Sequence, residues 1–95
     1  MNKKEEQDRK AKILKALAHP TRLYIVEMLL AGEKCVNDIK DLFDVTQPNI
    51  SQHLNILKSS GVVGYRKVRN LRCYFLKNPE GVKKIIEDVK GLADI

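Results

Sequence analysis

Apolar residues recur at intervals of three and four along most of the chain, which is the spacing of one helix face. The clearest case is central, where Ile50, Leu54 and Leu57 stand at i, i+4 and i+7. This spacing predicts five helices, over residues 10–18, 20–31, 35–43, 47–59 and 79–93. A different pattern separates the last two helices, because residues 62–69 and 71–77 alternate between apolar and polar side chains as β-strands do.

Residues that favour helix starts stand at the expected boundaries. Pro20 can occupy the first turn of the second helix, and Thr46 is a good N-cap for the fourth. Asn78 and Pro79 combine an N-cap with a proline at the first position of the last helix. The two strands are predicted to join near Arg69-Asn70, with the asparagine suited to the positive φ that a tight hairpin often needs.

The order of these elements (α-α-α-α-β-β-α) defines a mainly α fold with a small β-hairpin, a winged helix-turn-helix. We expect one domain over residues 1–95, with the helix-turn-helix at 36–59 and the wing at 62–77. The helices at 10–18 and 79–93 carry apolar stripes that pack either on the chain's own core or on a partner. We expect a homodimer through these stripes, which comprise Ile13, Leu14, Leu17, Val82, Ile85, Ile86, Val89 and Leu92.

The net charge of +6 is concentrated in one part of the chain. Residues 45–79 contain no acidic residue, and elsewhere the basic and acidic residues balance. The basic residues of this acid-free window are Lys58, Arg66, Lys67, Arg69, Arg72 and Lys77. A localised basic surface on a helix and a hairpin is typical of a protein that binds nucleic acid.

The helix over residues 47–59 is the predicted recognition helix. Its outward face carries Ser51, Gln52 and Asn55, which are side-chain types that hydrogen-bond base edges in the major groove. The basic wing would contact phosphates or enter the minor groove, or guard the hairpin against edge pairing. The predicted DNA contacts are Thr46, Gln47, Asn49, Ser51, Gln52, His53, Lys58, Lys67, Arg69 and Arg72. Among them, His53 lies on the flank of the apolar stripe, so a half-buried, hydrogen-bonded histidine is an equal alternative.

Other classes of protein find little support. No apolar run approaches the about 18 residues that cross a bilayer, and the N-terminus lacks a signal peptide's apolar stretch, so we expect a cytoplasmic protein with no membrane partner. No nucleophile elbow, His-Glu-x-x-His, Cys-x-x-Cys or phosphate loop is present, which predicts that the chain is not an enzyme. The alternative to a DNA-binding regulator is a thiol-based metal-binding or redox-sensing protein in which DNA binding is secondary.

Four stretches resemble the ArsR/SmtB family of bacterial repressors: ALAHPTRL (16–23), TQPNISQHL (46–54), LKSSGVV (57–63), and CYFL (73–76) with NPE (78–80). The resemblance covers residues 11–90. It implies a homodimer that binds an inverted-repeat DNA operator and is released by an inducer, usually a metal ion or arsenic(III), and in some members thiol oxidation or a sulfur species. The family's Cys-Val-Cys is Cys35-Val36-Asn37 here, and residues 79–95 contain no histidine, so no metal site is carried over.

Cys35 and Cys73 remain as candidate sensor thiols. Cys35 stands near a helix N-terminus, where the helix dipole favours a reactive thiolate or a soft-metal ligand, although it would also serve as a plain N-cap. Cys73 stands on a strand and could be a packed small apolar residue. Arsenic(III) at Cys35 would need cysteines from both protomers or a bound small thiol. A bridge between the two cysteines would need Cα atoms within about 7 Å.

Overall fold

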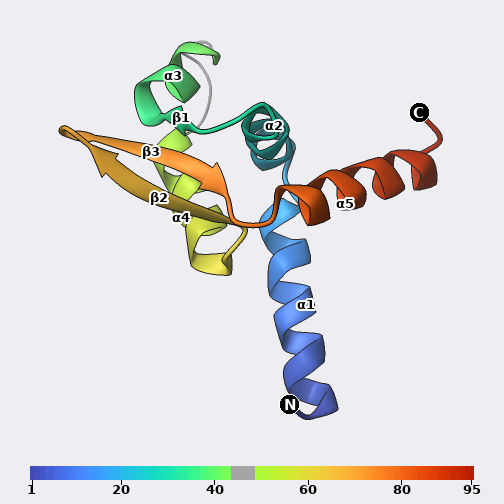
Figure 1. Cartoon of the computed structure of the whole chain (residues 1–95). Helices are drawn as coiled ribbons and strands as arrows, with labels where there is room; N and C mark the ends of the chain where they lie inside the picture. Colours follow the sequence, from blue (N-terminus) through green and yellow to red (C-terminus); the bar gives the residue numbers. More distant parts are fainter. Residues whose placement is uncertain (44–48) are drawn as a thin grey trace.

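The structure, a computed structural model, describes residues 1–43 and 49–95 (Figure 1). The described elements are, in chain order, α1 (Lys3–Leu17), α2 (Pro20–Leu29), β1 (Lys34–Cys35), α3 (Val36–Asp41), α4 (Ile50–Ser60), β2 (Val63–Val68), β3 (Leu71–Leu76) and α5 (Pro79–Leu92). They form the predicted mainly helical, winged helix-turn-helix arrangement. Within the described ranges, no helix is long and apolar enough to cross a membrane.

Polar side chains cap the helices where the chain changes direction. Asn78 accepts a hydrogen bond from the backbone N–H of Gly81, which confirms the predicted start of α5. The predicted start of α4 after Thr46 is wrong, because α4 begins at Ile50 and its N-cap is Asn49. Thr46 itself, like Gln47, lies outside the described residues. At the other end of α4, Gly61 takes a left-handed φ of 89°, which suits a glycine C-cap.

The sheet has three antiparallel strands in the order β1-β3-β2 rather than the two predicted. The added strand, β1, pairs Lys34 with Tyr74 and Cys35 with Cys73. It is two residues long, too short to leave an alternating pattern in the sequence. The chain turns directly from β1 into α3, so the strand ties the start of the helix-turn-helix to the wing.

The hairpin turn differs from the prediction in one detail. Val68 and Leu71 are Cα partners, which leaves Arg69 and Asn70 as a two-residue loop. The positive φ, 60°, belongs to Arg69 and not to Asn70. A positive φ at the first of two loop residues is the feature of a II′ turn, which matches the twist of the flanking strands.

The core lies between α2, α4 and the sheet, and it also takes in two residues predicted for the dimer face. Leu17 and Val82 are 5% and 7% exposed and belong to the main apolar cluster. Contacts within the chain already cover them, so they leave little free surface for a partner, and the dimer face stays a prediction. The partly buried members of the predicted face, Ile13, Ile85 and Ile86, pack at the edge of the same cluster.

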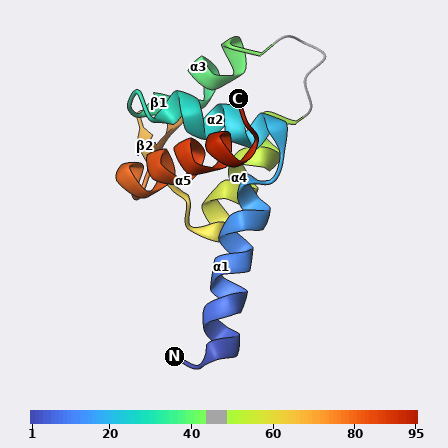
Figure 2. The ribbon, with the colours of Figure 1, turned by 90° about the vertical axis from the view of Figure 1, so that its right-hand side faces the viewer.

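Two helices extend beyond this core. In Figures 1 and 2 the N-terminal half of α1 runs away from the rest of the chain, and α5 leaves the body on the side opposite the tip of the wing. The exposed apolar residues on these helices include Leu14, Val89 and Leu92, the last 88% exposed. Helix α1 is longer than predicted, since it begins at Lys3 with Asn2 as its N-cap.

The turn geometry generates a test by matched glycine substitutions. Arg69→Gly should raise the free energy of unfolding or leave it unchanged, with a gain of up to about 1 kcal/mol, because relief of the positive φ offsets the entropy that glycine costs. Asn70→Gly should lower it by about 0.5–1 kcal/mol, because that position has no positive φ to relieve. Urea unfolding measures both, and the opposite order of the two variants would contradict the observed turn.

Candidate nucleic-acid interface

One face of α4 is buried and the opposite face is polar. Ile50, Leu54 and Leu57 are buried, as their spacing predicts. Ser51, Gln52 and Asn55 are exposed, and Lys58 is exposed near the end of the helix. The helix therefore presents small uncharged hydrogen-bonding groups to the outside, which is the chemistry that reads base edges.

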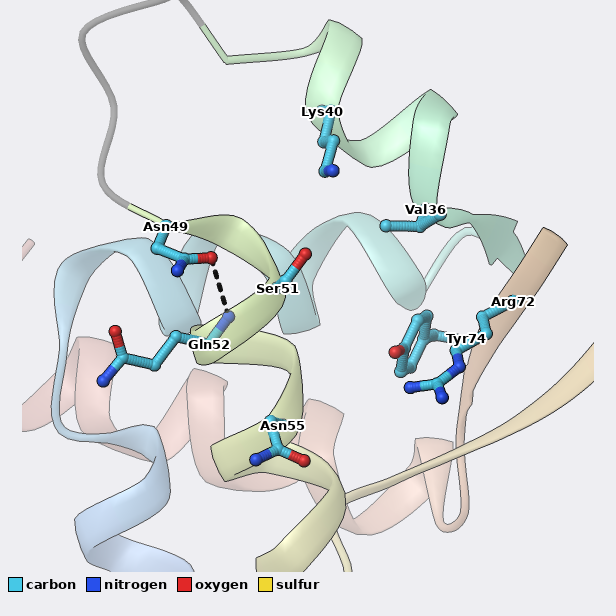
Figure 3. A pocket seen from close by; sticks show the side chains of 8 residues that line it. All are labelled: Val36, Lys40, Asn49, Ser51, Gln52, Asn55, Arg72 and Tyr74. Carbon is cyan, nitrogen blue, oxygen red and sulfur yellow. Dashed lines mark hydrogen bonds between the residues drawn. The ribbon is translucent and has the colours of Figure 1, made fainter.

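The polar face borders a concave space of about 560 Å³ between α3, α4 and β3 (Figure 3). The space is lined by Val36, Lys40, Asn49, Ser51, Gln52, Asn55, Arg72 and Tyr74. The charged side chains in this lining, Lys40 and Arg72, are both positive. The lining therefore suits an anionic, hydrogen-bonding surface such as the edge of a nucleic-acid groove.

Asn49 has a different role from the one predicted for it. Its Oδ1 accepts a hydrogen bond of 3.1 Å from the backbone N–H of Gln52, which caps α4 (Figure 3). A base contact through this oxygen would compete with the cap. The side chain of Gln52 is exposed and, among the described residues, makes no hydrogen bond that would compete with a base.

His53 is not part of the exposed face. It is 8% exposed, its ring lies 4.4 Å from that of His19, and its Nδ1 is 3.1 Å from Nη1 of Arg22. Because a guanidinium only donates, Nδ1 is the acceptor in this hydrogen bond. The prediction that His53 contacts DNA is thus corrected, and the buried, hydrogen-bonded alternative fits the structure.

Arg22 joins three helices at this point. Its Nε donates to the carbonyl oxygen of Ala16 at 2.6 Å and its Nη2 to that of Lys15 at 3.3 Å, so it caps the end of α1. The third contact, to His53, holds the first turns of α4 in place. No pattern in the sequence predicts this junction. The only signal is an arginine two residues after the proline that begins α2.

The wing carries fewer free charges than its composition suggests. Arg66 forms two hydrogen bonds of 2.8 Å with the carboxylate oxygens of Glu33, which lies outside the acid-free window. These bonds hold the pKa of the Glu33 carboxyl below its ordinary value and raise the pKa of Arg66. Lys67, Arg69 and Arg72 are exposed and, among the described residues, have no carboxylate within ion-pair distance.

The two cysteines are joined by a disulfide. Cys35 and Cys73 face each other across β1 and β3 with their Cα atoms 3.7 Å apart, which is under the upper limit of about 7 Å and closer than the about 4.4–6.8 Å usual for a bridge. Cys73 is fully buried, Cys35 is partly exposed, and the sulfur of Cys35 makes no capping hydrogen bond to α3. Residues next to the bridge, Val36, Arg72 and Tyr74, line the space beside α4.

Both sulfur atoms are used by the bridge. In the part of the chain that the structure describes, no three His, Cys, Asp or Glu side chains are grouped so that they could hold a metal ion.

A helix-turn-helix with a polar recognition face, followed by a basic wing, defines a winged-helix DNA-binding protein. A profile described as "Bacterial regulatory protein, arsR family" matches residues 19–65. An uncharacterized HTH-type transcriptional regulator of Methanocaldococcus jannaschii is 42% identical over 93% of this chain and 99% of its own length. The chain belongs to the ArsR family of transcriptional regulators.

Two further relatives support this assignment. The HTH-type transcriptional repressor SmtB of Mycobacterium tuberculosis is 45% identical over 63% of this chain, a match that covers 44% of SmtB. The second is the homodimeric winged helix-turn-helix DNA-binding domain of a possible ArsR-family regulator from Mycobacterium bovis. It superposes with a TM-score of 0.78 at 30% identity, over 99% of this chain and 88% of the other.

The buried histidine makes stability depend on pH. Burial lowers the pKa of His53 below 6.5, and His19 and Arg22 beside it lower it further. The unfolded chain therefore binds a proton more readily, so stability should be lost as pH falls from about 6.5 through the lowered pKa. His53→Gln keeps an acceptor for Arg22 without the proton site and should flatten this dependence. Urea unfolding between about pH 5 and 7 measures the free energy of unfolding against pH. Ser51→Ala, the control, should keep the wild-type slope. The same slope in His53→Gln would contradict the role of His53.

Proposed function

We propose that the chain acts as a homodimeric repressor that reads an inverted-repeat DNA operator with α4 and holds the DNA backbone with its wing. The observation that carries this proposal is the division of labour on the surface. The exposed face of α4 carries Ser51, Gln52 and Asn55, whereas the free positive charges Lys67, Arg69 and Arg72 lie on the wing. Its place of action would be the cytoplasm.

The base contacts are assigned on exposure and position. Ser51 and Gln52 lie in the first turn of α4, the part of a recognition helix that usually reaches the bases. Thr46 and Gln47 stay predictions at the entry to this helix, for a phosphate and a base respectively. Lys58, at the other end of α4, would contact a phosphate.

The exposed apolar residues of α1 and α5 support the homodimer. Leu14, Val89 and Leu92 are exposed apolar side chains on these helices, and a second copy would cover them. The relative from M. bovis is described as homodimeric. A twofold dimer would set two copies of α4 about 34–36 Å apart, which matches successive major grooves on one side of DNA.

The division of labour generates two contrasting variants. Gln52→Ala should weaken binding to a selected operator by about 1–3 kcal/mol per altered base contact and leave binding to unrelated DNA nearly unchanged. Lys67→Gln should weaken both and reduce the salt slope by about one for each phosphate that the variant no longer neutralises. Fluorescence anisotropy against salt measures these effects, with Lys84→Gln on α5 as the matched charge control. An equal loss of affinity for both DNAs in Gln52→Ala would contradict the assignment of Gln52 as a base contact.

A second function is favoured by the disulfide: we propose that Cys35 and Cys73 form a redox pair that regulates DNA binding. Hydrogen peroxide would serve as the oxidant. The partly exposed Cys35 thiolate attacks one peroxide oxygen, the O–O bond breaks, a sulfenic acid forms, and the leaving hydroxide takes up a proton from solvent to become water. The thiol of Cys73 then attacks that sulfur, the S–S bond forms, and a second water leaves with the proton of the thiol.

The bridge should favour binding, because it holds Arg72 and Tyr74 in place beside α4 and lowers the cost of ordering them. We expect the oxidised protein to bind a selected operator about three- to tenfold more tightly than the protein reduced with dithiothreitol. Cys35→Ser and Cys73→Ser should each abolish the difference. Anisotropy titrations of the three proteins, with arsenite, zinc and cadmium as further arms, test this. Equal affinities of oxidised and reduced wild type, or a difference that survives in both variants, would refute it.

A further inference from the structure

Tyr65 contacts two positive side chains from different elements. Its ring centroid is 4.7 Å from Nζ of Lys58, in the last turns of α4, and 4.9 Å from Cζ of Arg72, on β3. Both distances fall within the about 6 Å over which a cation is attracted to an aromatic ring. The ring thus links the recognition helix to the wing.

The ring itself is held by its neighbours on the sheet. Tyr65 and Tyr74 are Cα partners on β2 and β3, and their ring centroids lie 5.7 Å apart. Tyr74 is buried, whereas Lys58 and Arg72 are exposed. Tyr65 therefore packs against a buried tyrosine ring and contacts two exposed cations.

Two cations on one ring repel each other, and no carboxylate among the described residues lies within ion-pair distance of either. A phosphate bound to either cation would lessen this repulsion. Figure 3 shows Arg72 directed from β3 toward α4, beside the ring of Tyr74 and across from Asn55. The pair therefore stands next to the proposed base-reading face, where the backbone of a bound duplex would pass.

We infer that Lys58 and Arg72 bind phosphates of the DNA backbone, and that Tyr65 is the positioning residue that holds them. The inference rests on the DNA-binding function proposed above. Arg72 would offer paired N–H donors and Lys58 a point charge to the backbone phosphates. Tyr65 contacts neither the DNA nor a base; it reduces the freedom that the two long side chains would lose on binding.

The test removes the π face while keeping the bulk. Tyr65→Leu and Tyr65→Met should each weaken binding by about three- to tenfold, and Tyr65→Phe, which keeps the face, should bind within about twofold of wild type. The probes are a selected operator and an unrelated mixed-sequence duplex, each of about 30 base pairs, or three helical turns. Because a phosphate carries no sequence, both probes should lose affinity by the same factor.

A double-mutant cycle separates positioning from a general structural role. In a Lys58→Gln, Arg72→Gln background, Tyr65→Leu should change the affinity by less than about 1.5-fold, because nothing remains for the ring to hold. Thermal unfolding identifies any variant that no longer folds, and Tyr65→Met then stands in for Tyr65→Leu.

Two results would overturn the inference while the proposed function stands. One is wild-type affinity in both Tyr65→Leu and Tyr65→Met, while Lys58→Gln or Arg72→Gln weakens binding. The other is an undiminished effect of Tyr65→Leu in the double-glutamine background. A wild-type protein that binds neither duplex would instead overturn the proposed function and the inference together.

Discussion

The burial of one face of α4 is the constraint on which the rest of the structure depends. Leu54 and Leu57 have no exposed surface, since this face contacts α1, α2 and β2. Burial of each leucine contributes about 1.5–3 kcal/mol, and a small domain has only about 5–15 kcal/mol of net stability. Helix α4 therefore cannot turn about its axis, and Ser51, Gln52 and Asn55 must face outward. The junction of Arg22 and His53 fixes the same helix near its start.

The acid-free basic window has a more specific meaning in the folded chain than in the sequence. Arg66 is paired with Glu33, so the free positive charge is confined to fewer residues. Lys58 and Arg72 come together on Tyr65, although they are far apart in sequence. Lys58 and Arg72 therefore lie beside the uncharged face of α4. Under the proposed function, this placement would separate attraction to the phosphate backbone from the reading of bases.

Much of the fold could be predicted because the residues at helix starts and the apolar stripes along the helices indicate the same elements. Asn78-Pro79 defines the start of α5, and the spacing of Ile50, Leu54 and Leu57 defines the buried face of α4. The sequence did not reveal β1, whose two residues are paired only through distant β3. Nor did it reveal which members of an apolar stripe meet the chain's own core, because periodicity gives a face and not its partner. Leu17 and Val82 lie on the predicted dimer face and yet belong to the chain's own core.

The candidate site was predictable to a similar limit. Exposure of Ser51 and Gln52 followed from the helical wheel, whereas the capping role of Asn49 and the burial of His53 depend on tertiary contacts. The approach of Cys35 to Cys73 depends on a strand that left no pattern. The contacts of His53 and of the two cysteines join residues that are distant in sequence and meet only in the folded chain. The cap by Asn49 follows from a helix that starts later than predicted.

Hydroxyl-radical footprinting on a duplex selected for tight binding tests most directly whether two copies of α4 read an inverted repeat. We predict two protected backbone stretches related by a twofold axis, with their centres about one helical turn of 10–10.5 base pairs apart or a multiple of it. A selection that returns no preferred sequence, or a single protected stretch without symmetry, would contradict this mode of binding.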